Sequence, residues 1–87
     1  MSQRHPEPSS LASLAPGQAG NILGLDVSPE LRDRLNALGL KIGKPVTVIR
    51  RGALGGPLHV RVGMTELVLR RKEAQLIAIA PSDLLTA

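Results

Sequence analysis

Few residues of this 87-residue chain have side chains suited to catalysis. There are two histidines, and only His59 falls in the region that we expect to fold. Nucleophilic catalysis needs a serine or cysteine within reach of a base, but strand alternation points His59 outward. A Walker loop needs a lysine and a serine or threonine after its glycines to hold phosphate, and the segment ALGGPL has neither. We therefore predict no catalytic residue and no enzymatic activity.

Side chains that could ligate a metal ion are equally scattered. The chain has no cysteine, which excludes thiolate ligands and fits a reducing compartment. The second histidine, His5, lies in the N-terminal segment, far from His59 in the sequence. The carboxylates do not show the spacing of a zinc or iron site. We predict neither a metal site nor a cofactor.

The sequence offers a binding surface instead, in a loop rich in glycine and proline. Two glycines and a proline force a turn that leaves Leu54 near its tip. A stiff apolar tip loses little entropy when it docks, and binding residues are often found on such loops. Two arginines precede the loop and could face an acidic partner. The predicted partner-binding residues are Arg50, Arg51, Leu54, Gly55, Gly56 and Pro57.

A simpler interpretation of the same residues remains open. The loop can be an ordinary hairpin, and the arginines can form a solvated rim, because exposed ion pairs contribute little. A second basic pair, Arg70 and Arg71, ends a later strand and could face the same acidic partner. Replacing Leu54 with alanine separates the two interpretations, since a docking residue can be removed without loss of thermal stability.

A short helix must position this loop. Ser28 is suited to an N-cap, Pro29 to the first helical position, and Gly39 to the left-handed residue that ends the helix. A helix of this length is not stable alone and must pack its apolar face on a core. We expect that face to cover one open end of the domain, and its residues at i, i+4 and i+7 are Leu31, Leu35 and Leu38.

The remaining apolar segments are short and bounded by turn residues. The predicted strands span residues 20–25, 46–53, 58–62, 65–70 and 76–80. A tight turn is expected at Gly63 and Met64, and one helical turn at residues 71–75. The predicted fold class is mainly β, a small SH3-like barrel of about five strands with one short α-helix between the first two. We expect the sheet to close on itself, which would protect its edges.

Composition limits the domain organisation and the partners. We predict a disordered tail at residues 1–10, one folded domain at residues 11–80 and a C-terminal tail at residues 81–87. No apolar run suits a membrane span or a signal sequence, so we expect a cytoplasmic protein without direct membrane insertion. The formal charge of +4, from 11 Lys and Arg against 7 Asp and Glu, permits an acidic partner without selecting one.

Four patterns, in order and at these spacings, resemble the FeoA family, the small cytoplasmic ferrous iron transport protein A. Between Leu11 and Ala80 they read LxxLxPGQxGxI, LRxRLxALGLxxG, VxVxRRxxLGGPLxVxV and LxLRRxEAxxI. The resemblance implies an SH3-like fold and a non-enzymatic accessory role in bacterial ferrous iron uptake. The implied partner is FeoB, a membrane permease with a GTP-hydrolysing cytoplasmic domain. The LGGP turn of the family maps onto residues 54–57, and its LGL turn onto residues 38–40.

An alternative function is a basic SH3-like barrel that binds RNA or the ribosome. The segment GQAGNI and the positive charge motivate it, and it predicts RNA affinity that falls steeply with salt. The absence of Phe, Tyr and Trp weighs against it, because aromatic rings are the usual platforms for stacking bases. We expect no nucleic acid partner and leave self-association open.

Overall fold

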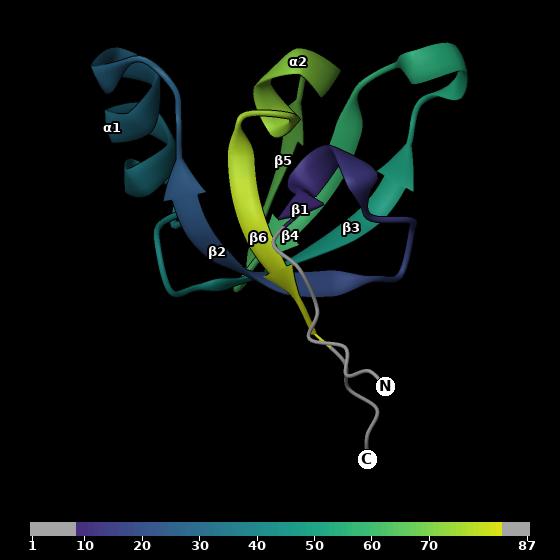
Figure 1. The fold of residues 1–87 in the computed structure, drawn as a ribbon, viewed down its shortest axis with the longest axis horizontal. Helices are drawn as coiled ribbons and strands as arrows, with labels where there is room; N and C mark the ends of the chain where they lie inside the picture. The colour runs from purple at the N-terminus through teal and green to yellow at the C-terminus, as the bar shows by residue number, and fades with distance from the viewer. Residues whose placement is uncertain (1–8, 83–87) are drawn as a thin grey trace, which may run out of the picture.

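The computed structural model describes residues 9–82, which form a strongly curved antiparallel sheet with short helices at its margins (Figure 1). Helix α1, helix α2 and the connection between β3 and β4 project from the same end of the sheet. In chain order, the elements are β1 (Ser9–Ser10), η1 (Leu11–Ser13), β2 (Ala19–Leu25), α1 (Pro29–Ala37), β3 (Pro45–Arg51), η2 (Ala53–Gly55), β4 (Leu58–Val62), β5 (Thr65–Leu69), α2 (Arg71–Ala74) and β6 (Ile77–Pro81).

The strand order is β1-β6-β2-β3-β4-β5, so the sheet is open and the expectation of a closed sheet is wrong. The mainly β class with one short helix is confirmed. Strand β1 has only two residues before η1 begins, and among the described residues it pairs with β6 and not with β5. Leu11 and Ala12 of η1 are buried in the core, and η1 packs against α2 and β6. Apolar side chains of η1 therefore fill the opening that a further strand would have closed.

Both limits of the folded domain lie slightly outside the predicted range 11–80. Ser9 and Ser10, which lie in the tail predicted from the sequence, pair with Ile79 and Ala78 as β1. At the other end, Pro81 is the last residue of β6 and lies opposite Gly20. A proline is tolerated at a strand end, where its missing N–H breaks no further pairing. The predicted tails at residues 1–8 and 83–87 lie outside the described residues.

Helix α1 begins as the sequence indicates. The backbone N–H of Leu31 donates to Ser28 Oγ over 3.2 Å. Leu35 is buried and Leu31 packs against the core, but Leu38 is 43% exposed. The expected three-leucine stripe is therefore wrong at its last position, because the helix ends at Ala37 and Gly39 turns the chain with φ of +101°. Leu40 enters the core instead, fully buried.

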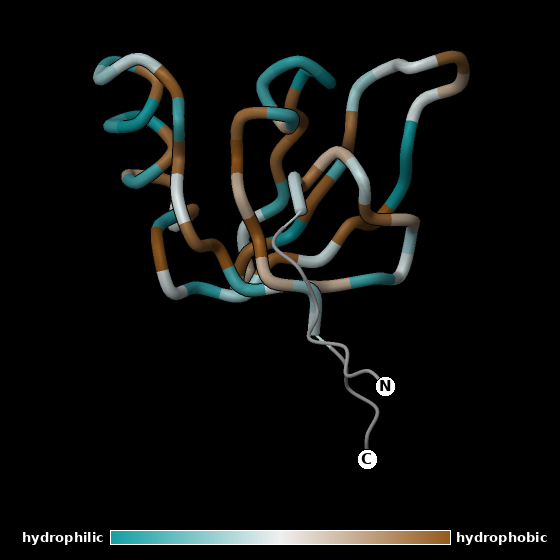
Figure 2. The backbone as a smooth tube through the Cα atoms, in the orientation of Figure 1, coloured by the Kyte–Doolittle hydropathy of each residue, from teal (hydrophilic) through white to brown (hydrophobic). Residues whose placement is uncertain are grey.

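The core consists of aliphatic side chains, and buried and exposed residues alternate along β4 as predicted. Figure 2 shows hydrophobic residues recurring along the strands. Among the described residues no polar or charged side chain is fully buried. The buried residues are Leu11, Ala12, Leu14, Ile22, Leu35, Leu40, Val46, Val48, Leu58, Val60, Val62, Leu69, Ala74, Ile77 and Ile79.

Strand β2 forms the corner around which the sheet curves. Its first residues pair with β3, while most of its length pairs with β6. A Cβ atom on Gly20 would lie 2.8 Å from the carbonyl oxygen of Ala80, so only glycine permits this approach. The register with β6 shifts between Ile22 and Gly24, which marks a bulge that adds to the bend.

Replacing Leu35 with alanine should lower the free energy of unfolding by about 2–5 kcal/mol, because truncating a buried leucine leaves a cavity. The matched control Leu38→Ala should cost less than about 1 kcal/mol, because Leu38 is already largely exposed. The measurement is urea unfolding followed by circular dichroism, as the chain has no aromatic fluorophore. Equal losses at the two positions would show that Leu35 does not cover the core.

Candidate functional site

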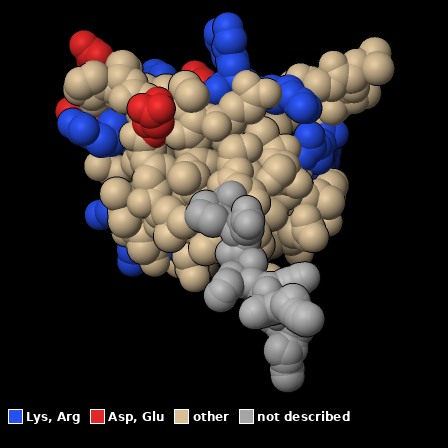
Figure 3. Space-filling model, viewed as in Figure 1, with Lys and Arg blue, Asp and Glu red and all other residues tan. Residues whose placement is uncertain are grey.

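The loop between β3 and β4 carries the most exposed large apolar side chain among the described residues. Leu54 has 104% of its reference accessible surface, so it is fully exposed. The loop ends in an apolar tip (Figure 2) and stands out from the body of the molecule at the upper right of Figure 3, with blue cationic atoms near its base. The structure thus places Leu54 at the tip, as the sequence indicates.

The backbone at Leu54 is strained. Its φ and ψ are 57° and 43°, and no other non-glycine residue in the range 9–82 has a positive φ. A left-handed conformation costs an L-residue with a Cβ about 1–2 kcal/mol. Such strain persists only where the surrounding structure enforces it, and it is often found at functional sites.

The neck of the loop enforces this conformation. Gly52 N–H donates to the carbonyl of Pro57 over 2.7 Å, and Gly56 N–H donates to Ala53 over 3.1 Å. A Cβ on Gly52 would lie 2.9 Å from Pro57 Cδ, and one on Gly56 would lie 3.2 Å from the Ala53 carbonyl. The two sides of the neck therefore meet backbone to backbone, and these contacts restrict the conformations that the tip can adopt.

The arginines at the base of the loop have different roles. Arg51 Nη1 donates to the carbonyls of Ala12 and Leu14, each over 2.7 Å, so Arg51 ties η1 and the residue after it to the end of β3. Arg50 is exposed. The structure therefore leaves Arg50 available on the surface and commits the guanidinium of Arg51 largely to the fold.

Arg71 is the cation that the predicted site did not include. A Cβ on Gly55 would lie 3.7 Å from Arg71 Cδ, so the side chain of Arg71 runs beside the loop from the first residue of α2. The sequence showed Arg70 and Arg71 as a second basic pair, but not which of the two approaches the loop. Only the curvature of the sheet brings α2 and this loop together.

A cluster of three polar side chains, His59, Arg61 and Glu66, lies on the outer face of β4 and β5. His59 Nε2 lies 2.8 Å from Glu66 Oε1, and Arg61 Nη2 donates to Glu66 Oε2 over 2.8 Å. The hydrogen bonds from Arg61 and His59 hold the pKa of the Glu66 carboxyl below its usual range. His59 points outward, as predicted. This cluster holds no serine or cysteine, so it offers no nucleophile for His59 to activate.

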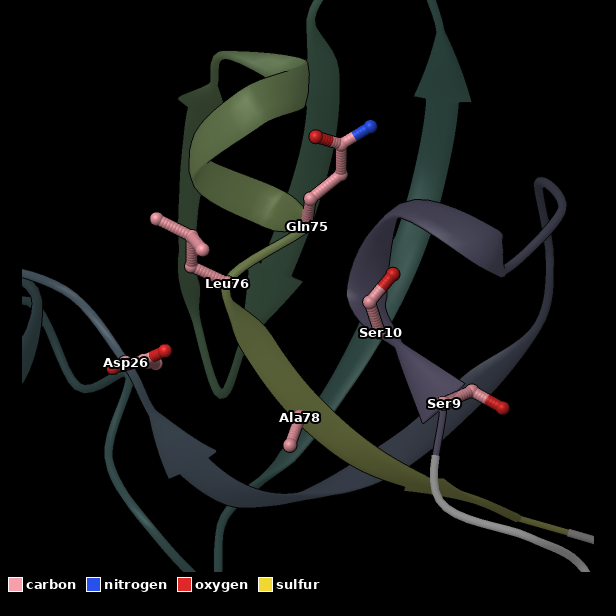
Figure 4. Close-up of a pocket in the computed structure, with 6 residues that line it drawn as sticks. All are labelled: Ser9, Ser10, Asp26, Gln75, Leu76 and Ala78. Carbon is pink, nitrogen blue, oxygen red and sulfur yellow. The ribbon is translucent and has the colours of Figure 1, made fainter.

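An open depression of about 330 Å³ lies between the start of β6 and β1 (Figure 4). Its lining residues are Ser9, Ser10, Asp26, Gln75, Leu76 and Ala78. Asp26 is the only charged group there, and it lies across the depression from the two serines. Within residues 9–82, no three His, Cys, Asp or Glu side chains lie close enough to hold a metal ion. No α-helix in this range is long and apolar enough to cross a bilayer.

The fold defines a small SH3-like domain. FeoA from Stenotrophomonas maltophilia complexed with zinc, described as a prokaryotic SH3 domain protein, is 26% identical and matches 84% of this chain and 94% of its own, with a TM-score of 0.71. A manganese-dependent transcriptional repressor matches 90% of this chain and 43% of its own with a TM-score of 0.79. At 19% identity, this second likeness concerns the fold alone.

The family follows from the sequence match. The FeoA domain model matches residues 9–81, and the chain belongs to the FeoA family. The FeoA protein from Chlorobium tepidum is 32% identical over 83% of this chain and 69% of its own, with a TM-score of 0.79. Iron(II) transport protein A from Clostridium thermocellum is also 32% identical over 83% of this chain, which spans 44% of that protein, with a TM-score of 0.76. The resemblance drawn from the four sequence patterns is confirmed.

Replacing Arg51 with methionine should lower the free energy of unfolding by about 1–3 kcal/mol, because two backbone carbonyls lose a charged donor. The control Arg50→Met should stay within about 0.5 kcal/mol, since Arg50 is exposed. Urea unfolding of the two variants measures the difference. If both variants match the unmodified chain, the contact between Arg51 and the η1 segment does not stabilise the fold.

The carboxyl of Glu66 should make stability depend on pH. Its pKa is lower in the folded than in the unfolded state, so its contribution is present above the unfolded pKa and is lost as pH falls through the folded pKa. The unmodified chain should therefore be more stable than Glu66→Gln at neutral pH, and the difference should vanish in acid. Because the group is exposed, molar salt should also reduce the difference. A difference that is constant with pH would contradict the ion-pair origin.

Proposed function

We propose that this protein is a non-enzymatic, cytoplasmic accessory factor of bacterial ferrous iron uptake that docks on the cytoplasmic part of a FeoB-like permease. Membership of the FeoA family supports the role in iron transport. The Stenotrophomonas maltophilia relative is described as a candidate activating factor for bacterial ferrous iron transport. The partner is expected to be the GTP-hydrolysing permease that the family resemblance implies.

The observation that carries the docking proposal is the exposed, conformationally fixed Leu54. Burying a leucine side chain contributes about 1.5–3 kcal/mol. A loop that is already rigid loses little conformational entropy when it binds, so more of this free energy remains as affinity. Arg50 and Arg71 lie at the base of the loop and favour an acidic rim around an apolar pocket on the permease.

The RNA-binding alternative gains no support from the arrangement of the cations. Arg51 donates to backbone carbonyls and Arg61 to Glu66, so neither is free for a phosphate. No aromatic ring is present to stack a base. RNA binding therefore stays the untested alternative, and the expectation from the sequence is that no nucleic acid partner binds.

Leu54→Ala should weaken binding to the purified cytoplasmic domain of a FeoB-like permease by roughly tenfold to a hundredfold, which corresponds to about 1.4–2.8 kcal/mol. The unfolding midpoint should not fall, because the Leu54 side chain is fully exposed. Isothermal titration calorimetry measures the affinity, and iron uptake in a deletion strain complemented with each variant measures the function.

Met64→Ala is the matched control. Met64 is 99% exposed in the hairpin at the opposite end of β4, so its removal deletes a similar apolar side chain away from the proposed site. This variant should bind and complement like the unmodified protein. Equal affinity of the Leu54 and Met64 variants would overturn docking through the loop. Absence of any binding by the unmodified protein, with uptake unchanged on deletion, would overturn the proposed function.

A further inference from the structure

The connection between α1 and β3 carries two of the chain's three lysines, Lys41 and Lys44. These residues are the ends of a β-turn, because the N–H of Lys44 donates to the carbonyl of Lys41 over 3.1 Å. Gly43, the third residue of the turn, has φ of +90°, which a glycine adopts without strain. Ile42 therefore lies at the tip of the turn, with a lysine at each end.

Backbone hydrogen bonds attach this turn to β2. The N–H of Gly43 donates to the carbonyl of Ile22 over 2.7 Å, and the N–H of Ile22 donates to the carbonyl of Lys44 over 2.9 Å. Ile42 is 65% exposed, and Leu23, which follows Ile22, is 47% exposed. The turn thus presents an apolar side chain to solvent from a backbone that is hydrogen-bonded within the chain.

The segment around this turn carries charge of one sign only. No Asp or Glu occurs between Asp33 and Glu66 in the sequence. Both lysines are exposed, and within residues 9–82 neither makes an ion pair or a side-chain hydrogen bond. Figure 3 shows blue cationic atoms at the lower left, the side on which the connection between α1 and β3 lies in Figure 1. The two ammonium groups are therefore available to anions outside the chain.

We propose that this turn docks on an anionic lipid surface. The ammonium groups of Lys41 and Lys44 contact the phosphates of the headgroups, and Ile42 lies between the headgroups at the boundary of the acyl chains. The protein lies on the bilayer and no element spans it. Each lysine near an anionic leaflet raises the binding constant about fivefold, and burial of the apolar side chain adds to this. The inference goes beyond the docking of Leu54 and does not depend on it.

The residue types favour lipid over an acidic protein surface. Lysine is depleted in protein–protein interfaces, whereas arginine is enriched. Arginines lie at the base of the Leu54 loop, but lysines flank Ile42. A lysine stem can also lie along apolar surface while its ammonium group stays in the polar layer. The turn and the loop lie at opposite corners of Figure 1, so one can face a bilayer while the other faces a protein.

Co-sedimentation of the full chain with vesicles tests the charge contact. Vesicles of phosphatidylglycerol and phosphatidylcholine should bind it at up to about 5 mM lipid, and vesicles of phosphatidylcholine alone at least tenfold more weakly. Replacing Lys41 and Lys44 together with glutamine should lower the binding constant about 25-fold. Replacing both with arginine should preserve binding, because the charge is kept. Binding should also weaken as the salt concentration rises.

Ile42→Ser tests the apolar contact. It should weaken binding to the anionic vesicles about fivefold to tenfold. Val68→Ser is the matched control, because Val68 is also β-branched and is 64% exposed, but it shares the outer face of β5 with Glu66. The control should bind like the unmodified chain. Urea unfolding should give all these variants nearly the same midpoint, because every replaced side chain is exposed.

Absence of binding to the anionic vesicles overturns the proposal. If the double glutamine variant then also binds the permease domain more weakly, the turn faces an acidic protein surface instead. Equal binding to the two kinds of vesicle, or equal losses in Ile42→Ser and Val68→Ser, also overturns it. Failure of the unmodified chain to bind the permease domain, with vesicle binding intact, would count against the proposed function alone.

Discussion

Burial of aliphatic side chains on one concave face is the constraint on which the rest of this structure depends. The chain has no aromatic residue, so no single large side chain can fill the interior. Leucine, isoleucine and valine from several strands must instead converge, and strands this short achieve it only if the sheet bends sharply. The bend is made at β2, where Gly20 allows β6 to approach and the bulge between Ile22 and Gly24 turns the strand. The open side is filled by η1 and by Leu35 and Leu40.

This packing also determines what is left outside. Val48 and Val60 are buried opposite each other, which fixes the register of β3 with β4 and hence the connection between them, residues 52–57. Because both ends of the connection are fixed in the sheet, Gly52 and Pro57 lie in contact and are joined by a backbone hydrogen bond. The residues between them turn away from the core. Arg51, the last residue of β3, is held beside this connection by its hydrogen bonds to the carbonyls of Ala12 and Leu14. The conformation of the loop is therefore coupled to the packing of the core below it.

The parts of the fold that follow local rules could be predicted from the sequence. Period-two alternation identified β4 and β5, and capping residues identified the start of α1. Strand β1, which forms one edge of the open sheet, could not be predicted. Ser9 and Ser10 carry no apolar pattern and form a strand only by pairing with β6. The burial of Leu40 in place of Leu38 depends on where Gly39 turns the chain. Arg51 resembles Arg50 in the sequence, and only its contacts with residues 37 and 39 positions away distinguish them. At the loop, the sequence indicated an exposed leucine but not its left-handed backbone.

The choice of residue at position 54 is what the fold alone does not explain. A glycine would adopt φ of 57° without strain, and the leucine side chain makes no contact that offsets the cost of about 1–2 kcal/mol. A manganese-dependent repressor shares the fold at 19% identity, so the scaffold itself does not define a function. What defines it must lie in groups that the scaffold presents without using. Leu54 is such a group, and the docking contact proposed for it would account for a strained, fully exposed leucine in this loop.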